Sequence, residues 1–123
     1  MKYLILIYSN PMSRELWKGF SQAERAEGLR AYEALTEDLA ASGELIVGEA
    51  LADPSLAKRV EVRDGHTMTT DGPFAEVKEL LAGFFFIQCE SFERAIAVAA
   101  RVPEAEFGLV EVRPVMDLSG FEM

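Results

Sequence analysis

The sequence predicts an α+β fold in which one antiparallel sheet is covered by two helices. Short runs rich in β-branched and aromatic residues occur near both ends and in the middle of the chain, and two amphipathic segments separate them. Their order is strand, helix, strand, hairpin, strand, helix, strand. This is the split βαβ plan of a ferredoxin-like fold, with an inserted β-hairpin. Because 123 residues suit one domain, we expect residues 1–123 to form a single domain.

The first element is a strand over residues 3–8, which is apolar on both faces and therefore needs cover on both. Residues 10–19 contain Pro11 and Gly19 and are expected to form a loop that holds one helical turn near residues 15–18.

The first helix has clear end signals. Ser21 followed by Glu24 is a capping box, and Gly43 supplies the residue that ends the helix. Between them, large side chains recur every three or four residues: Leu29, Tyr32, Leu35 and Leu39.

The middle of the chain predicts a short strand over residues 45–47 and then an exposed hairpin. Residues 58–63 alternate polar side chains with valine, and residues 66–70 return after the turn signal Asp64-Gly65.

The last third predicts a buried strand over residues 83–89, a helix and a final strand over residues 109–113. Ser91 caps this second helix and Pro103 ends it. Its predicted apolar stripe consists of Phe92, Ala95, Ile96, Ala99 and Val102.

In this plan both helices lie on one face of the sheet, so the other face of strands 3–8 and 83–89 would expose a large apolar area. A homodimer formed through the sheet faces would cover it. A meander or a loop folded over that face is the alternative, although the segments after the strands are polar.

Composition excludes several classes of function. Twelve Lys and Arg against 21 Asp and Glu give a net charge of −9, which disfavours direct binding of nucleic acid. No apolar run is long enough for a membrane span, and the first residues do not read as a signal peptide, so we expect a cytoplasmic protein. A single cysteine, Cys89, and a single histidine, His66, exclude a disulfide and multi-histidine or all-cysteine metal sites. We expect neither a metal nor a cofactor.

The segment Asp71-Gly72-Pro73-Phe74, continued by charged residues up to Gly83, resembles the bacterial DGPF family, which is grouped with the YCII-related proteins. Matching stretches at residues 1–8, 48–51, 62–65 and 111–114 extend the resemblance over nearly the whole chain. The resemblance implies a dimeric α+β barrel. DGPF proteins are often encoded near extracytoplasmic-function sigma factors, so it also implies a possible sigma-factor-linked regulatory role.

Many YCII-related proteins carry a histidine on the first helix and an aspartate near the end of the second, as a suspected catalytic pair. This chain departs at both places. Counting back from Gly43, Tyr32 occupies the first position, and the second falls on Val102 or a neighbour, with no carboxylate from residue 95 to 102. The resemblance therefore does not transfer a His and Asp pair.

Asp71 has two interpretations. In the structural one, its carboxylate accepts backbone hydrogen bonds, Gly72 permits a positive φ, and Phe74 fills the core. In the functional one, Asp71 is a rigidly held carboxylate with a catalytic acid/base role.

Four further residues are candidates for ligand binding. Tyr32 is either a core tyrosine or a phenol that contacts a ligand. Glu111 and Arg113, two residues apart on one strand face, form either a salt bridge at the rim or part of a pocket. Tyr8, at the end of the first strand, completes the set.

The sequence therefore favours a homodimeric protein that binds a small molecule or serves as a regulatory accessory protein. The alternative is a small cofactor-free enzyme that uses Asp71 with Tyr32 or Glu111 as acid/base groups.

Overall fold

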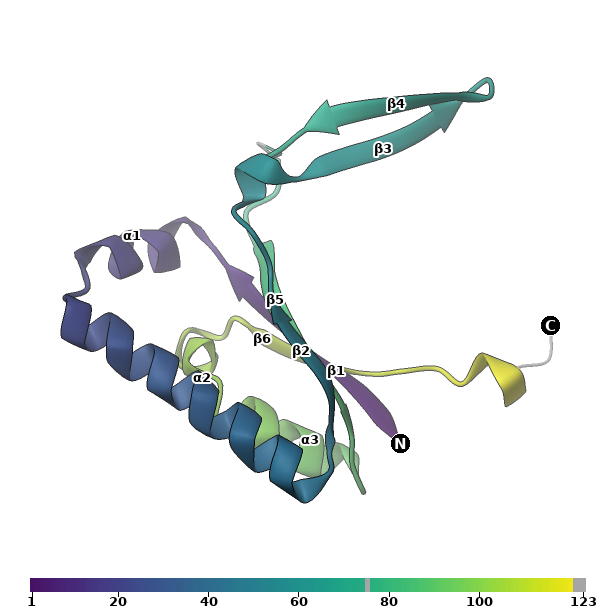
Figure 1. The fold of residues 1–123 in the computed structure, drawn as a ribbon. Helices are drawn as coiled ribbons and strands as arrows, with labels where there is room; N and C mark the ends of the chain where they lie inside the picture. Colours follow the sequence, from purple (N-terminus) through teal and green to yellow (C-terminus); the bar gives the residue numbers. More distant parts are fainter. Residues whose placement is uncertain (75, 121–123) are drawn as a thin grey trace.

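A computed structural model describes residues 1–74 and 76–120, and its centre is an open four-stranded antiparallel sheet (Figure 1). The strand order is β2-β5-β1-β6, which is the order of the split βαβ plan. The strands of this sheet are β1 (Lys2–Ser9), β2 (Leu45–Ala50), β5 (Leu80–Gln88) and β6 (Val110–Pro114). The predicted α+β class is confirmed.

Helices α2 (Gln22–Ser42) and α3 (Phe92–Ala99) lie on the same side of the sheet (Figure 1). The predicted ends of α2 are confirmed. The Ser21 hydroxyl accepts a hydrogen bond from the Glu24 backbone N–H, and Gly43 has a φ of 79°.

The first loop is more helical than the sequence prediction. Residues Pro11–Gly19 form helix α1, where one turn was expected. Its start is set by Asn10, whose side chain accepts a hydrogen bond from the Ser13 backbone N–H, and by Pro11 in the first helical turn. These two signals outweigh the Gly and Pro content that suggested a loop.

Helix α3 ends earlier than predicted, and the chain then enters the short 3₁₀ helix η2 (Pro103–Phe107). Ala95, Val98, Ala99 and Val102 are buried, whereas Ile96 is 51% exposed. Phe92 is also exposed, at 38%, so the predicted apolar stripe was wrong at Phe92 and Ile96.

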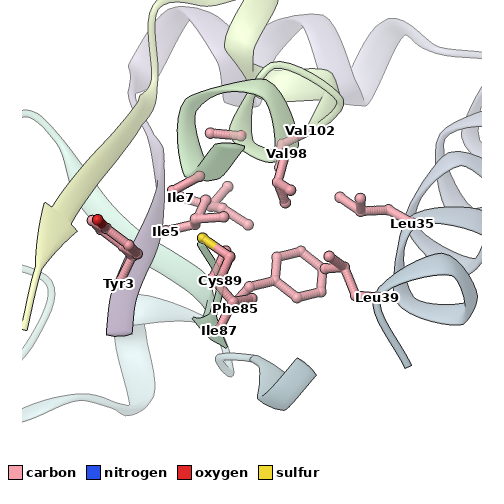
Figure 2. Packing of buried hydrophobic residues seen from close by; sticks show 12 residues of the cluster. Tyr3, Ile5, Ile7, Leu35, Leu39, Phe85, Ile87, Cys89, Val98 and Val102 are labelled. Carbon is pink, nitrogen blue, oxygen red and sulfur yellow. The ribbon is translucent and has the colours of Figure 1, made fainter. Parts of the chain in front are cut away.

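The core lies between the sheet and the two helices (Figure 2). Ile5 of β1, Ile87 of β5 and Leu35 of α2 are fully buried. Figure 2 shows Leu35 and Leu39 of α2 pointing toward the side chains of the sheet. Each apolar side chain of this size gains about 1.5 to 3 kcal/mol from burial, so this face contributes most of the hydrophobic stabilisation.

The predicted hairpin is confirmed as β3 (Lys58–Arg63) and β4 (His66–Asp71), a separate two-stranded sheet. Asp64 and Gly65 form its turn with φ values of 53° and 77°. Every residue of both strands is exposed. In Figure 1 the hairpin extends away from the body of the protein, on the side opposite α2.

Neither α2 nor α3 lies on the second face of the central sheet (Figure 1). Leu4 and Leu6 of β1 pair with Phe86 and Phe84 of β5, so these side chains alternate with the core residues and lie on this face. Each of the four is partly exposed. We name these four residues the open face.

Within the described part of the chain, no helix combines the length and the apolar character that crossing a membrane requires.

Candidate functional site

A hollow with a volume of about 610 Å³ lies at one end of the molecule's helical layer. It lies between α1, α2, η2 and the ends of β1 and β5, and its size falls within the usual range of small-molecule sites. Its walls are largely aromatic and apolar, and the rings that line it belong to Tyr8, Trp17, Phe20, Tyr32 and Phe107. We call it the α1–α2 pocket.

A second, smaller hollow of about 380 Å³ lies beside η1 (Pro54–Leu56). Asp53 is the one titratable side chain that lines it, and Asp53 also lines the α1–α2 pocket. Because the smaller hollow contains so few polar groups, the α1–α2 pocket is the better candidate site.

Gly28 explains why the α1–α2 pocket is open. It lies in α2 four residues before Tyr32, so both residues share one helix face. A Cβ atom at Gly28 would meet no heavy atom within 4 Å. The missing side chain therefore leaves free volume above Tyr32, where most residues would fill the space.

The polar centre of the pocket is a contact between α2 and η2. The Tyr32 hydroxyl donates to the Glu104 carboxylate, with distances of 2.5 and 2.6 Å to its two oxygens. The Tyr32 ring is stacked on Phe85 of β5, with centroids 6.4 Å apart, so the sheet fixes its orientation. Glu104 reaches this position because Pro103 begins η2 after a connection of three residues from the end of α3.

This contact changes the acidity of the phenol. Burial raises the pKa of Tyr32 well above its ordinary value of 10, and the hydrogen bond to the Glu104 carboxylate raises it further. Tyr32 is therefore a neutral hydroxyl across the physiological pH range. Its proton is held toward Glu104.

A second polar group lies at the α1 end of the pocket. Arg14 donates to the Ser9 hydroxyl at 3.2 Å. The pKa of Asp53 is lowered mainly by hydrogen bonds from Ser55, with a smaller contribution from the positive charge of Arg14. Arg14 is thus already engaged on two sides.

The structure brings Tyr8 and Tyr32 together in the α1–α2 pocket, as two of the predicted ligand-binding residues. It places Glu111 and Arg113 elsewhere. They pair with Leu6 and Leu4 across β1 and β6, which puts them beside the open face, and they form an ion pair of 2.6 Å.

Asp71 lies at the end of β4, outside the residues that line either hollow. Its side chain is 75% exposed and forms an ion pair with Lys58, the residue opposite it in the hairpin. Its assignment as a catalytic residue stays a prediction.

The structural roles predicted for Gly72 and Phe74 were wrong. Gly72 is not among the glycines with positive φ. A Cβ atom there would lie 2.7 Å from the Pro54 carbonyl oxygen, so close backbone approach requires this glycine. Phe74 is not in the core. It packs under the Arg59 guanidinium, whose carbon lies 3.7 Å from the ring centre.

Among the described residues, no group of three or more His, Cys, Asp or Glu side chains is arranged to hold a metal ion. His66 begins β4 opposite Arg63 at the hairpin turn, and Cys89 is buried in the core.

The sequence analysis missed Glu104 and Gly28. The carboxylate position implied by the family resemblance lies before Pro103, where the second helix was predicted to end, and the sequence did not predict η2 beyond it. A glycine inside a predicted helix is a signal that could have identified Gly28, since glycine lowers the stability of a helix and is retained there when packing or function requires it.

Comparisons with known proteins agree with this architecture. An uncharacterised protein of Rhizobium meliloti (strain 1021) is 32% identical over 117 residues, which are 94% of this chain and 92% of that protein. A solved structure of the 5-chloro-2-hydroxyhydroquinone dehydrochlorinase of Burkholderia phenoliruptrix, in complex with 2,5-dihydroxybenzoquinone, has a TM-score of 0.52. The match covers 94% of both chains at 18% identity, so it shows a shared fold. The family model of the YCII-related domain matches residues 1–119, and the chain therefore belongs to the YCII-related family.

Proposed function

We propose that the protein binds a small, partly apolar molecule in the α1–α2 pocket. The observation that carries this proposal is the pocket itself, which has about 610 Å³ of volume, aromatic walls and a polar centre at Tyr32 and Glu104. A concave, mostly apolar site with a few oriented polar groups is the usual form of a small-molecule site.

The dehydrochlorinase of similar fold was solved with a small ring compound bound, which supports the idea that this architecture can hold such a ligand. Binding without turnover is what a regulatory accessory protein requires. A sigma-factor-linked role rests on the family resemblance alone.

Position 28 offers a sharp test. Gly28→Phe would place a ring in the free volume of the pocket, whereas the matched variant Gly28→Ala adds one methyl group and retains most of that volume. Both variants should fold, because alanine and phenylalanine are better helix formers than glycine. We expect native mass spectrometry of the protein, purified from its own host, to show a bound small molecule in the wild type and in Gly28→Ala. It should be absent in Gly28→Phe.

A wild-type protein without any adduct, or an adduct that survives in Gly28→Phe, would contradict binding in the α1–α2 pocket.

A cofactor-free enzyme is the second candidate. The observation that favours it is the Tyr32 hydroxyl, held by hydrogen bonding to a carboxylate inside the pocket. The partner suggested by the sequence is Asp71 or Glu111, and the structure adds Glu104. For an identified substrate, Asp71→Asn should retain affinity and lose turnover if Asp71 is the acid/base group. Unchanged turnover in Asp71→Asn and loss in Tyr32→Phe would instead assign the chemistry to the pocket pair.

We also propose that two copies associate through their open faces, which is how a pair of such open sheets would form a dimeric α+β barrel. The support is the open face itself. Its four residues are apolar and partly exposed, and neither α2 nor α3 covers them (Figure 1). The hairpin extends past this side of the sheet, where it would flank a second copy.

Light scattering tests the dimer. Phe86→Glu should give a monomer, because two buried carboxylates would meet across the interface. Ile96→Glu introduces the same charge at a half-exposed position on α3 and should leave the dimer intact. A monomeric wild type would rule out this association.

A further inference from the structure

Glu104 differs from the other carboxylates that line the α1–α2 pocket. Glu24 accepts the Ser21 backbone N–H, and Asp53 accepts the Ser55 backbone N–H at 2.9 Å. Glu104 has the Tyr32 hydroxyl as its hydrogen-bond partner. Within residues 1–74 and 76–120, no ion pair includes Glu104. It is a partly buried negative charge without a cation.

The Tyr32–Glu104 pair presents hydrogen-bond acceptors to the pocket. A phenol has one proton, and Tyr32 directs it at the two carboxylate oxygens. The phenol oxygen and the carboxylate oxygens then have only lone pairs available for further hydrogen bonds. The pair can therefore receive hydrogen bonds from a ligand, but it has no proton left to donate to one.

The side chains around the Tyr32–Glu104 pair indicate what kind of ligand could bring a hydrogen-bond donor to it. Trp17 and Phe20 pack edge to face with ring centroids 6.1 Å apart, and Leu51 and Phe107 also line the pocket. Apolar walls of this kind favour an apolar body. A partly buried carboxylate gains most from a donor that reaches it where little water competes.

We infer that the Tyr32–Glu104 pair determines the ligand specificity of the α1–α2 pocket, and that its ligand is a small aromatic or otherwise apolar molecule bearing a hydrogen-bond donor. The shared chemistry is an O–H or N–H group, from a hydroxyl or a protonated amine. This inference rests on the proposed binding function and adds which ligand class the pocket selects.

An anionic group at the same position is disfavoured, because it would place negative charge against the Glu104 carboxylate. Two cations line the pocket, Arg14 and Lys18, and both already have partners. Arg14 donates to the Ser9 hydroxyl and lies near the Asp53 carboxylate, and Lys18 forms an ion pair with Glu15. The pocket thus selects donors over acceptors at its Tyr32 end.

The test compares four ring probes of similar size: toluene, 4-methylphenol, benzylamine and benzoate. Trp17 is the single tryptophan of the chain and lines the pocket, so its indole N–H resonance gives one NMR signal that follows each titration. We expect 4-methylphenol or benzylamine to bind at least about tenfold more tightly than toluene, and benzoate to bind most weakly. The two donor probes separate a neutral hydroxyl from a charged amine as the source of the donor.

Two variants and one control locate the effect. Glu104→Met removes both acceptor oxygens and should abolish the preference for donor probes, while Glu104→Gln retains one acceptor without the charge and should reduce it. Glu106→Gln removes an exposed carboxylate on the same short helix and should leave the wild-type order unchanged.

The outcomes separate the two proposals. If toluene binds as tightly as the donor probes, or if the donor preference persists in Glu104→Met, the inference is overturned while binding in the pocket stands. Benzoate as the tightest probe would overturn it too. If no probe shifts the Trp17 resonance and the purified protein carries no adduct, the proposed binding function fails as well.

Discussion

Two polar contacts of the same length lie in very different parts of this molecule. The Tyr32 hydroxyl is 2.5 Å from Glu104, and the Lys58 ammonium is 2.5 Å from Asp71. The first joins α2 to η2 inside an aromatic pocket, and its phenol has a strongly raised pKa. The second spans the hairpin with side chains that are 60% and 75% exposed. Burial and neighbouring groups, more than the length of the contact, therefore determine the chemical properties of a polar pair.

The largest loss of stability is expected from a substitution at Gly72, next to Asp71, because the backbone is closely packed there. Gly72→Ala would place a Cβ atom 2.7 Å from the Pro54 carbonyl oxygen, and the Gly72 N–H already donates to Ala57 at 2.8 Å. Overpacking of this kind costs about 1 to 3 kcal/mol. Urea unfolding should show this loss. The control Gly28→Ala, in open space within α2, should gain up to about 1 kcal/mol. An unchanged free energy of unfolding in Gly72→Ala would mean that the backbone around Gly72 can shift to accommodate the added methyl group.

The next largest loss of stability should come from the Tyr32–Glu104 pair. Tyr32→Phe removes the hydroxyl from a partly buried carboxylate and should lower the free energy of unfolding by about 1 to 2 kcal/mol at neutral pH. Denaturant unfolding measures it. Tyr8→Phe is the matched control, because among the described residues no hydrogen bond of its hydroxyl is found. Equal losses in both variants would show that Tyr32 is no different from another pocket tyrosine.

The same pair predicts a pH dependence on the alkaline side. The pKa of Tyr32 is raised in the folded protein, so folding favours the protonated phenol, and this contribution is complete below pH 10. Above pH 10 the unfolded chain releases the proton while the folded chain retains it, and stability falls. Melting curves between pH 9 and 11.5 should therefore show a steeper decline for the wild type than for Tyr32→Phe. Parallel curves would contradict a buried, protonated phenol.

The smallest effect should come from Asp71→Asn. An exposed ion pair contributes about 0 to 1 kcal/mol, so the melting temperature should change by no more than a few degrees. High salt should reduce the difference in melting temperature between the wild type and Asp71→Asn, because it screens this exposed pair. A loss comparable with that of Gly72→Ala would mean that Asp71 anchors the loop, as its structural interpretation states.

The sequence predicted the fold well because its signals are local. Ser21, Glu24 and Gly43 define the ends of α2 through their own backbone contacts, and Asp64-Gly65 defines the hairpin turn. The candidate site was predicted only in part. Tyr32 was identified, but its partner Glu104 lies 72 positions away, and their contact depends on how η2 packs against α2. Such a long-range contact leaves no periodic pattern in the sequence.

The predicted pair Glu111 and Arg113 also shows that local sequence patterns do not determine tertiary packing. The alternation of a strand correctly placed both residues on one face, and their ion pair exists. Which face of the sheet the helices cover is set by the tertiary arrangement, and here it is the opposite one. The spacing predicted the pair, and the packing decided that it lies away from the pocket.

The hairpin of β3 and β4 also determines how the molecule should move. Its strands pair with each other and with no strand of the central sheet, and all of their residues are solvent-exposed. A two-stranded ribbon of this kind is only marginally stable by itself. Its amides should therefore exchange with solvent through frequent local opening, whereas those of β1 and β5 should exchange through global unfolding. The α1–α2 pocket can therefore stay rigid while the hairpin changes its conformation on contact with another molecule.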